Sequence, residues 1–458
     1  MPAKQVNPEF LLILDYNLSR TRDVAAMRDY ARTRYGLRTL LIRARPQSID
    51  RSISDVVIDL DPHASTFVAS ALEALAPFRS AIAAGLVFSD KAVHQGALLL
   101  DALGLPVDNP ALAQAALNKE IYRRAEQRYQ DILAPQGLFM PACRRITTLA
   151  ELVQFTNSQS DGFVIKPACE GNNRGVIMLR QGDDLPAALE EVSRYLPDGV
   201  ICEQRIPFNR EFSFDGLSAL NFITEKLSAG GRYPVEEGQF VPATVTAAEA
   251  RLIRRAGSLA NVLVGQCDGP FHNEIKVSDD GKRAAVVEPN RRPAGMKIWS
   301  LARRVYGIDF FQLWVDQALG QPVPDSLPPP HGHAATLMLG VPFDCAHLQA
   351  DGSLGERLLA QQVMPALRQR GVLPTDARLD LFDFVWLHDS DRPVRAVPRD
   401  NGDFVAHVCI YSPTQDLDMR TLVAQTQAEW RRALAAYLGR AEPTQSLRAT
   451  AAVTAYPA

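Results

Sequence analysis

Short apolar runs alternate with helix-like segments over the first hundred residues, and this alternation constrains the fold more than any other feature of the chain. Strands separated by helices form parallel sheets, because each helix crosses back over the sheet and covers one of its faces. No G-x-G-x-x-G motif follows the first run, so nothing indicates a dinucleotide site. Strands are predicted at residues 10–15, 37–44, 55–60 and 84–90, and helices at 66–80 and 91–103.

The pattern changes after about residue 138, where shorter strands and turns replace the long alternation. Because 458 residues are too many for one ordinary core, this change indicates further domains of mixed α+β type. A proline-rich stretch at residues 320–333 is typical of a linker. The predicted elements are a hairpin at 162–179, strands at 199–206 and 210–226, and helices near 247–263 and 417–438.

The composition excludes several classes of protein. A formal net charge of -3 argues against a nucleic-acid partner, which would require a basic face. No stretch reaches the ~18 uninterrupted apolar residues of a membrane span, and the first residues lack the apolar core of a signal peptide. The six cysteines are scattered without C-x-x-C spacing, which favours reduced thiols. We therefore expect a cytoplasmic protein with no membrane partner.

A Gly/Asn-rich turn follows an apolar strand that ends near Lys166. Glycine and asparagine accept positive φ, so the backbone N–H groups of residues 171–175 can converge on an anion. A lysine five residues earlier adds the point cation that a phosphate group needs. The turn alone is weak evidence, and the chain has no Walker A motif, so a plain turn remains the alternative.

The stretch HNEIKVSDDGKRAAVVEPNRRPAG, residues 272–295, is the most specific pattern. Glu288 and Asn290 are two residues apart and would share one face of a strand, while Glu274 would lie opposite them across the DDGK turn. Carboxylate and amide oxygens are the ligands that Mg²⁺ takes. The alternative is a surface ladder of acids and arginines, worth ~0–1 kcal/mol per pair. His272 is either a substrate contact or a structural histidine.

Taken in order, these motifs resemble the ATP-grasp superfamily of carboxylate–amine ligases. The pieces are NK on a helix, IKP…G…RGV, EQRI…REFSFDG, HNEIKV and EPNRRPAG, and the pattern is most similar to the L-amino-acid ligases that form dipeptides. The resemblance implies a Rossmann-like pre-ATP-grasp domain followed by a two-part clamp around ATP. It divides the chain into that domain (1–108), a lid subdomain with a linking helix (109–202), a catalytic subdomain (203–325) and a small C-terminal α+β domain (326–458).

The resemblance also implies roles for individual residues, with ATP and Mg²⁺ or Mn²⁺ as cofactors. The lysines at 119 and 166 resemble those that hold the phosphates, residues 171–175 resemble the flap above them, and residues 203–206 resemble the hinge beside the adenine. The ATP set is Lys119, Lys166, Gly171, Asn172, Asn173, Arg174, Gly175, Glu203, Gln204, Ile206 and the ribose-binding Glu211; the metal set is Glu274, Glu288 and Asn290; the catalytic set is Arg292 and His272.

The resemblance implies an enzyme that forms an amide or peptide bond through an acyl-phosphate, with small-molecule carboxylate and amine substrates, and with release of ADP. Two alternatives stay open: a purine-pathway-type ligase or bicarbonate-activating carboxylase of the same fold, and a non-catalytic ATP-binding module. Similar enzymes are often homodimers. The chain departs from the family at Pro293-Ala294, where the usual pattern has a glycine, and in the EGNNRG flap.

Overall fold

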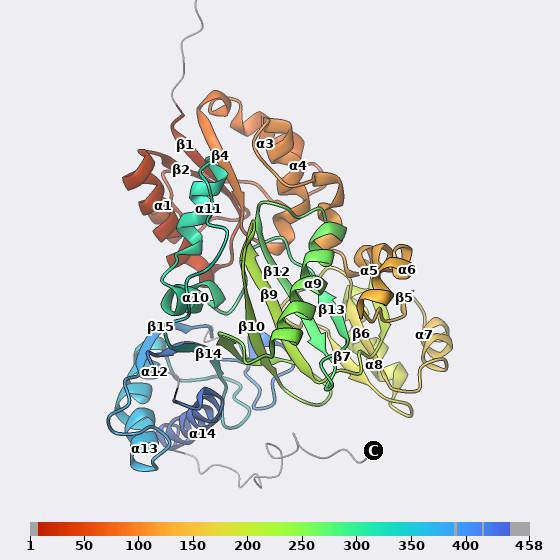
Figure 1. Cartoon of the computed structure of the whole chain (residues 1–458), viewed down its shortest axis with the longest axis vertical. Coiled ribbons are helices and arrows are strands. Elements are labelled where there is room, and N and C mark those ends of the chain that lie inside the picture. Colours follow the sequence, from red (N-terminus) through yellow and green to blue (C-terminus); the bar gives the residue numbers. More distant parts are fainter. Residues whose placement is uncertain (1–7, 389–391, 415, 440–458) are drawn as a thin grey trace, which may run out of the picture.

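The computed structural model of the chain describes residues 8–388, 392–414 and 416–439 (Figure 1). Three β-sheets organise these residues, and helices cover them. Among these residues, no helix combines the length and the apolar character that crossing a membrane requires.

The N-terminal sheet is parallel throughout, as the alternating pattern predicted, and its strand order is β3-β2-β1-β4. Every residue of its central strand is buried, because helices lie on both faces. The strands are β1 (Phe10–Leu14), β2 (Arg38–Arg43), β3 (Val56–Asp59) and β4 (Ile82–Val87), and the helices are α1 (Thr21–Tyr35), α2 (Ser48–Ile53), α3 (Phe67–Leu75) and α4 (Val93–Leu103).

A small antiparallel sheet with the order β5-β8-β6-β7 follows the linking helix α5 (Lys119–Arg128). The side chain of Asn118 accepts hydrogen bonds from the first two free N–H groups of α5 and so fixes where this helix begins. β6 and β7 pair as an antiparallel hairpin, in agreement with the prediction. The elements are β5 (Cys143–Ile146), β6 (Phe163–Pro167), β7 (Ile177–Leu179), β8 (Val200–Gln204), α7 (Leu149–Thr156) and α8 (Leu185–Glu191).

The largest sheet has eight strands in the order β13-β12-β9-β10-β11-β14-β16-β15. Its first five strands are β9 (Arg210–Leu217), β10 (Leu220–Ser228), β11 (Glu236–Val241), β12 (Pro270–Val277) and β13 (Ala284–Glu288). The strands β14 (His333–Leu339), β15 (Asp380–Trp386) and β16 (Ala406–Ser412) come from the C-terminal segment and continue this sheet, rather than forming a sheet of their own. The boundaries of the four domains remain a prediction.

Helices fix the sheets to one another. α9 (Ala247–Leu263) begins at a capping box of Thr246 and Glu249 and occupies the residues predicted for it. α10 (Ile298–Tyr306) and α11 (Phe310–Ala318) pack Trp299 and Trp314 into a core that also holds Phe88 of the N-terminal domain. α12 (Gly352–Leu358), α13 (Met364–Gln369) and α14 (Met419–Tyr437) cover the C-terminal strands.

Candidate active site

The two carboxylates of the most specific motif face each other on neighbouring strands. Glu274 of β12 pairs in register with Glu288, the last residue of β13. Asn290 lies beyond the end of that strand, so the two-residue strand periodicity expected for it is wrong. Its side-chain amide nevertheless lies 3.4 Å from Glu288 Oε1, because the same amide also donates to the carbonyl of His272.

Two lysines, the half-buried Lys119 and the buried Lys226, neutralise these carboxylates. Lys119, the first residue of α5, places Nζ 2.8 Å from Glu288 Oε2. Lys226 of β10 has a fully buried side chain, and its Nζ lies 2.6 Å from Glu274 Oε1 and 3.3 Å from Glu211 Oε1, with Glu236 as a third partner. We call the six residues of this group the lysine–carboxylate cluster: Lys119, Lys226, Glu211, Glu236, Glu274 and Glu288.

Lys226 and Glu236 were not among the predicted site residues. Lys226 stands in the segment FITEK, where a lysine near the end of a strand resembles an ordinary edge charge. Its three partners lie on β9, β11 and β12, so only the strand order brings them together. Burial disfavours the charged form of Lys226, but Glu236 and Glu274 outweigh this effect and raise the pKa of the ammonium well above its usual value.

His272 is buried beside the cluster and bonds to acids through both ring nitrogens. Nδ1 lies 2.6 Å from Asp215 Oδ1, and Nε2 lies 3.4 Å from Glu274 Oε1. Burial lowers the pKa of His272, but Asp215 outweighs burial and raises it to about 9. Ser213 is fully buried and donates to Asp215 rather than to the imidazole, so these three residues do not form a nucleophilic triad.

Lys166 and Glu203 form a second ion pair of predicted nucleotide residues, on the small sheet. Lys166 Nζ lies 2.7 Å from Glu203 Oε2, and Arg123 Nε donates to Glu203 Oε1 at 2.9 Å. Burial alone would raise the pKa of Glu203, but Arg123 and Lys166 lower it to about 2. Gln204 accepts a hydrogen bond from the N–H of Ala142.

The predicted flap lies in the loop between β6 and β7. Just before the flap, the backbone carbonyl of Glu170 accepts a hydrogen bond of 2.6 Å from Lys119 Nζ. Asn172 and Asn173 adopt φ of 58°, and Gly175 adopts φ of 70°. A Cβ atom at Gly175 would lie 2.7 Å from the ring of Tyr195, so a glycine is required there. Ile206 follows β8 outside this loop and is half-buried.

Arg292 lies on the N-terminal side of the cluster, where its Nε donates to Asp90. The neighbouring loop departs from the family pattern at Pro293 and Ala294, and Arg20 donates to both of their carbonyls. Arg20 is held in turn by Asp23 of α1, which also pairs with Lys297 at 2.8 Å. The N-terminal domain therefore fixes the backbone of this loop through α1 and the residue before it.

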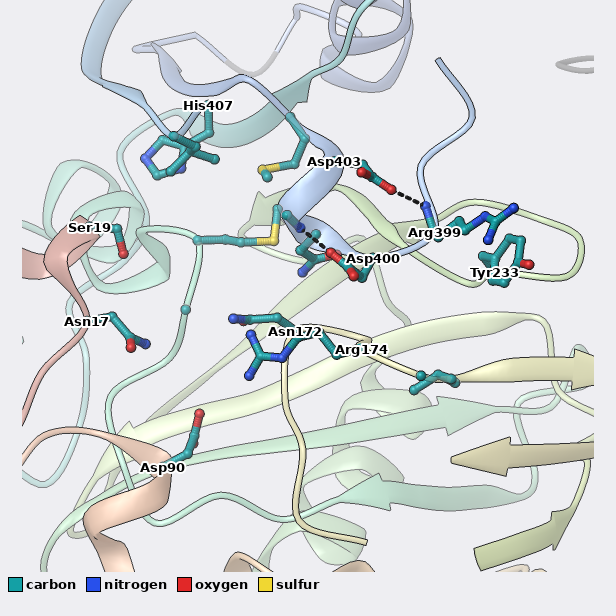
Figure 2. A pocket seen from close by; sticks show the side chains of 18 of the residues that line it. Asn17, Ser19, Asp90, Asn172, Arg174, Tyr233, Arg399, Asp400, Asp403 and His407 are labelled. Carbon is teal, nitrogen blue, oxygen red and sulfur yellow. Dashed lines mark hydrogen bonds between the residues drawn. The ribbon is translucent and has the colours of Figure 1, made fainter. Parts of the chain in front are cut away.

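Two cavities meet at Asp90, Asn172 and Arg174. The smaller, about 230 Å³, is lined by Lys119, Glu288 and Asn290 among others. The larger, about 790 Å³, extends from Asn17 and Asp90 past Asn172 to Tyr233 and Arg399 (Figure 2). Its volume is that of a site for a sizeable small molecule. The flap residues border both cavities, and the cluster reaches the smaller one.

The structure thus brings together five predicted site residues, Lys119, Glu211, Glu274, Glu288 and Asn290. Arg292 lies nearby and donates to Asp90. Three carboxylates of the cluster, Glu211, Glu236 and Glu274, suit a divalent cation, because their oxygen atoms lie within 4.8 Å of one another. Of the predicted metal set, only Glu274 belongs to this group. In the described structure Lys226 supplies the positive charge that these carboxylates need. A bound cation would therefore share them with the lysine.

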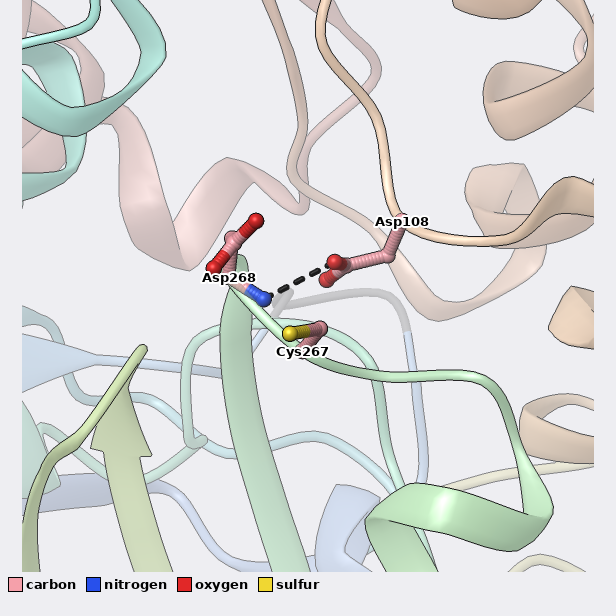
Figure 3. A group of neighbouring side chains, drawn as sticks. All are labelled: Asp108, Cys267 and Asp268. Carbon is pink, nitrogen blue, oxygen red and sulfur yellow. Dashed lines mark hydrogen bonds between the residues drawn. The ribbon is translucent and has the colours of Figure 1, made fainter.

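A second group with metal-ligand chemistry lies elsewhere, at Asp108, Cys267 and Asp268 (Figure 3). The two carboxylate oxygens of Asp108 accept hydrogen bonds from the N–H groups of Asp268 and Gly269, each at 2.8 Å. This bonding shapes the loop before β12 and accounts for the position of Asp108. The group is partly exposed.

Three comparisons place the chain among known proteins. No family model matches it. The D-alanine–D-alanine ligase of Gloeobacter violaceus is 28% identical over 232 residues, which cover 47% of this chain and 73% of that relative. The crystal structure of an L-amino acid ligase from Bacillus licheniformis gives a TM-score of 0.69 at 18% identity and covers 92% of this chain and 98% of the other.

A purine-pathway protein has a similar structure. The N5-carboxyaminoimidazole synthetase from Staphylococcus aureus, solved with ADP, gives a TM-score of 0.62 at 12% identity and covers 92% of this chain and 98% of the other. At such identities the structural likeness establishes the fold alone. It confirms the predicted class, an α/β domain joined to α+β domains.

Proposed function

From the premise that the chain is an ATP-grasp ligase, an enzyme that uses ATP to form a carbon–nitrogen bond and releases ADP, we propose that it joins two amino acids through an acyl-phosphate. The similarity to these ligases confirms the resemblance that the sequence predicted. The choice of amino acids is supported by the names of the D-alanine–D-alanine ligase and the L-amino acid ligase. The ADP in a similar synthetase supports ATP as the phosphoryl donor.

The observation that carries this proposal is the position of Arg292. Arg292 lines the larger cavity, and its guanidinium is held by Asp90, which also lines the smaller cavity with Lys119 and Glu288. Phosphoryl transfer depends mainly on positioning and charge neutralisation, and it needs no side-chain nucleophile. A cation at the junction of two cavities suits a phosphoryl group that passes from a nucleotide in one to a carboxylate in the other.

In this proposal, Lys119 and Lys166 bind the phosphates of ATP as point cations. Glu274, Glu288 and Asn290 hold Mg²⁺ or Mn²⁺, which neutralises charge on the phosphates. A carboxylate oxygen of the first substrate attacks the γ-phosphorus, the bond from that phosphorus to the bridging oxygen breaks, and ADP leaves. The amine of the second substrate then attacks the acyl carbon, and phosphate and a proton are released as the amide forms.

A hydroxylamine trap tests the acyl-phosphate directly. The enzyme is incubated with ATP, Mg²⁺, hydroxylamine and single amino acids, and the hydroxamate and ADP are both measured. We expect a hydroxamate with at least one amino acid, in amounts equal to the ADP released. If ADP is released without any hydroxamate from any acid, the acyl-phosphate route is wrong.

A second candidate, a purine-pathway-type ligase, is favoured by the structural similarity to the N5-carboxyaminoimidazole synthetase. Both candidates use ATP, so they are separated by the compound that triggers ADP release. Release that depends on an amino acid supports a peptide-forming ligase. Release that requires bicarbonate or a ribonucleotide amine supports the purine-type reaction.

A further inference from the structure

The larger cavity is strongly positive, although the chain as a whole carries a formal charge of -3. Among the described residues, eight arginine or lysine side chains line it, against four aspartate or glutamate side chains. The nucleotide does not explain this excess. Lys119, Lys166, Glu203 and Glu211 lie outside its lining, and of the predicted ATP residues only three from the flap border it.

The carboxylates of the lining already have partners. Asp90 pairs with Arg292, and Asp403 lies 3.3 Å from Arg395. Glu191 pairs with Arg232, which does not line the cavity, at 3.1 Å. Asp400 accepts the N–H of Gly402. The acids of the lining therefore leave part of the arginine charge unbalanced.

Three arginines of the lining, Arg194, Arg392 and Arg399, have no carboxylate partner among the described residues, and Arg392 donates to the carbonyl of Gly402. Figure 2 shows Arg399 beside Tyr233, at the end of the cavity farther from Asp90. Within the described part of the chain, neither Arg194 nor Arg399 has a carboxylate within ion-pair distance. Each guanidinium lies over a tyrosine ring, with Arg194 at 4.6 Å from the centroid of Tyr195 and Arg399 at 5.5 Å from that of Tyr233.

A guanidinium over a tyrosine ring retains N–H donors that can bind a ligand, although Nη2 of Arg194 also donates to the Tyr195 hydroxyl. The planar edge of a guanidinium presents paired N–H donors that match two oxygens of a carboxylate or a phosphate. Because the ring restricts the motion of the arginine, less conformational entropy is lost when the anion binds. The two arginines come from different parts of the chain, one beside α8 and one from the loop before β16, and both line this cavity.

We infer that a substrate of this enzyme carries an anionic group, carboxylate or phosphate, besides the groups that react, and that Arg194 and Arg399 bind it. This inference rests on the proposed function, because it assigns the substrate class to the same site. It narrows the amino-acid substrate to an acidic one, such as glutamate or aspartate, or to a phosphorylated one. The reacting carboxylate lies toward Arg292, and the extra anion lies at the tyrosine end.

Pairs of amino acids, one with an anionic side chain and one with a related neutral side chain, test this inference. ADP release is measured with glutamate against glutamine, aspartate against asparagine, and O-phosphoserine against serine. We expect the anionic member to have a kcat/KM at least about tenfold higher, since a charge-assisted hydrogen bond adds on the order of a factor of ten. A preference confined to O-phosphoserine assigns a phosphate, and one confined to the acidic amino acids assigns a carboxylate. Equal rates within every pair would overturn the inference.

A double variant, Arg194→Gln with Arg399→Gln, tests the two residues. We expect it to lower the anionic-to-neutral ratio of kcat/KM by about tenfold or more, because two charged donors are lost. The matched control is Arg34→Gln, which removes an arginine that also lies over the next residue, Tyr35, but lines neither cavity. A ratio that stays at the wild-type value in the double variant would overturn the assignment.

Calorimetry separates a failure of the inference from a failure of the proposed function. Glutamate and glutamine are titrated into the enzyme with a non-hydrolysable ATP analogue and Mg²⁺. Tighter binding of glutamate, lost in the double variant, supports the anion site even if no amino acid releases ADP. In that case only the proposed ligase reaction is wrong. Equal binding of the two amino acids counts against the anion site itself.

Discussion

The lysine–carboxylate cluster and the larger cavity, which Arg292 lines, differ in how their charged side chains are paired. In the cluster Lys226 is buried and Lys119 is half-buried, and each has at least one carboxylate within 3.3 Å. In the cavity the cations outnumber the acids, and Arg194 and Arg399 are exposed. Matched, buried charges hold a structure together, whereas unmatched charges at a cavity wall remain free to bind a ligand.

The difference indicates how each site meets its ligand. Under the proposed function, a metal–nucleotide complex at the cluster would share carboxylates that already pair with Lys119 and Lys226. An anionic substrate in the cavity would meet Arg194 and Arg399, which have no carboxylate partner among the described residues. Variants of the two sites test this contrast.

Breaking the cluster should cost the most stability. Lys226→Met removes the cation shared by Glu211, Glu236 and Glu274, and we expect the free energy of unfolding to fall by about 3–5 kcal/mol. Urea denaturation measures this. The control is Lys276→Met, since Lys276 is more exposed and lies 3.7 Å from Glu211. We expect that variant to lose less than about 1 kcal/mol. Equal losses would contradict a special role for Lys226.

Removing the cation between the two sites should impair turnover. We expect Arg292→Ala to lower kcat by on the order of 10²–10³-fold, because a positioned charge on the transferring phosphoryl group is lost. Steady-state ADP release measures it. Arg291→Ala is the control, because Arg291 donates to the carbonyls of Asn109 and Val264 and should affect stability rather than chemistry. Near-wild-type turnover in Arg292→Ala would remove Arg292 from the mechanism.

The free energy of unfolding should depend on pH through His407, a buried histidine that lines the larger cavity. Burial, reinforced by Lys297 and Arg20, lowers the pKa of His407 to about 3. The unfolded chain protonates this group below its ordinary pKa of about 6.5, whereas the folded chain does not. The stabilisation is therefore complete above pH 6.5 and is lost as the pH falls toward 3. At pH 5 the loss should be about 2 kcal/mol.

Urea denaturation at pH 8 and pH 5 checks this prediction. His407→Gln carries no titrating group at this position, so its stability should change less between the two pH values than that of the wild type. The same pH dependence in both proteins would show that other groups dominate. Asp23, the acid that raises the pKa of His407, is itself paired with Lys297 and Arg20 and offsets only part of their effect.

Ionic strength should affect substrate binding at the larger cavity more than it affects the ion pairs of the cluster, and this is the smallest of the expected effects. Arg194 and Arg399 are exposed, so raising the ionic strength from about 0.05 to 0.5 M should raise the KM of an anionic substrate by roughly two- to fivefold. The KM of its neutral isostere should change less. The Lys226 pairs are buried, and the destabilisation caused by Lys226→Met should be nearly the same at both salt concentrations. Equal salt effects on both isosteres would contradict the contrast.

Local patterns predicted the elements well. The helix at residues 247–263 was predicted without error, because its cap and its apolar period both lie within the segment. The DDGK turn predicted that Glu274 and Glu288 would face each other, because a short turn fixes the register of a hairpin. Such features depend on residues that are close in the sequence.

Features that depend on distant pairing could not be predicted in this way. Lys226 meets Glu236 and Glu274 only because β10 lies between β9 and β11, and nothing local fixes that order. Asn290 lies past the end of β13, where strand periodicity no longer applies. Arg20 reaches Pro293 and Ala294 from the N-terminal domain, 273 and 274 residues away. Roles for these residues remain predictions until variants are measured.

The continuation of the large sheet into the C-terminal segment bears on how the chain can be divided. β11 bonds to β14, and β14 bonds to β16. A chain ending before residue 333 would leave β11 as an open edge, with its unpaired backbone groups available to strands of other molecules. The last quarter or so of the chain therefore covers a strand edge that would otherwise be open to aggregation, and we expect a chain shortened before residue 333 to precipitate.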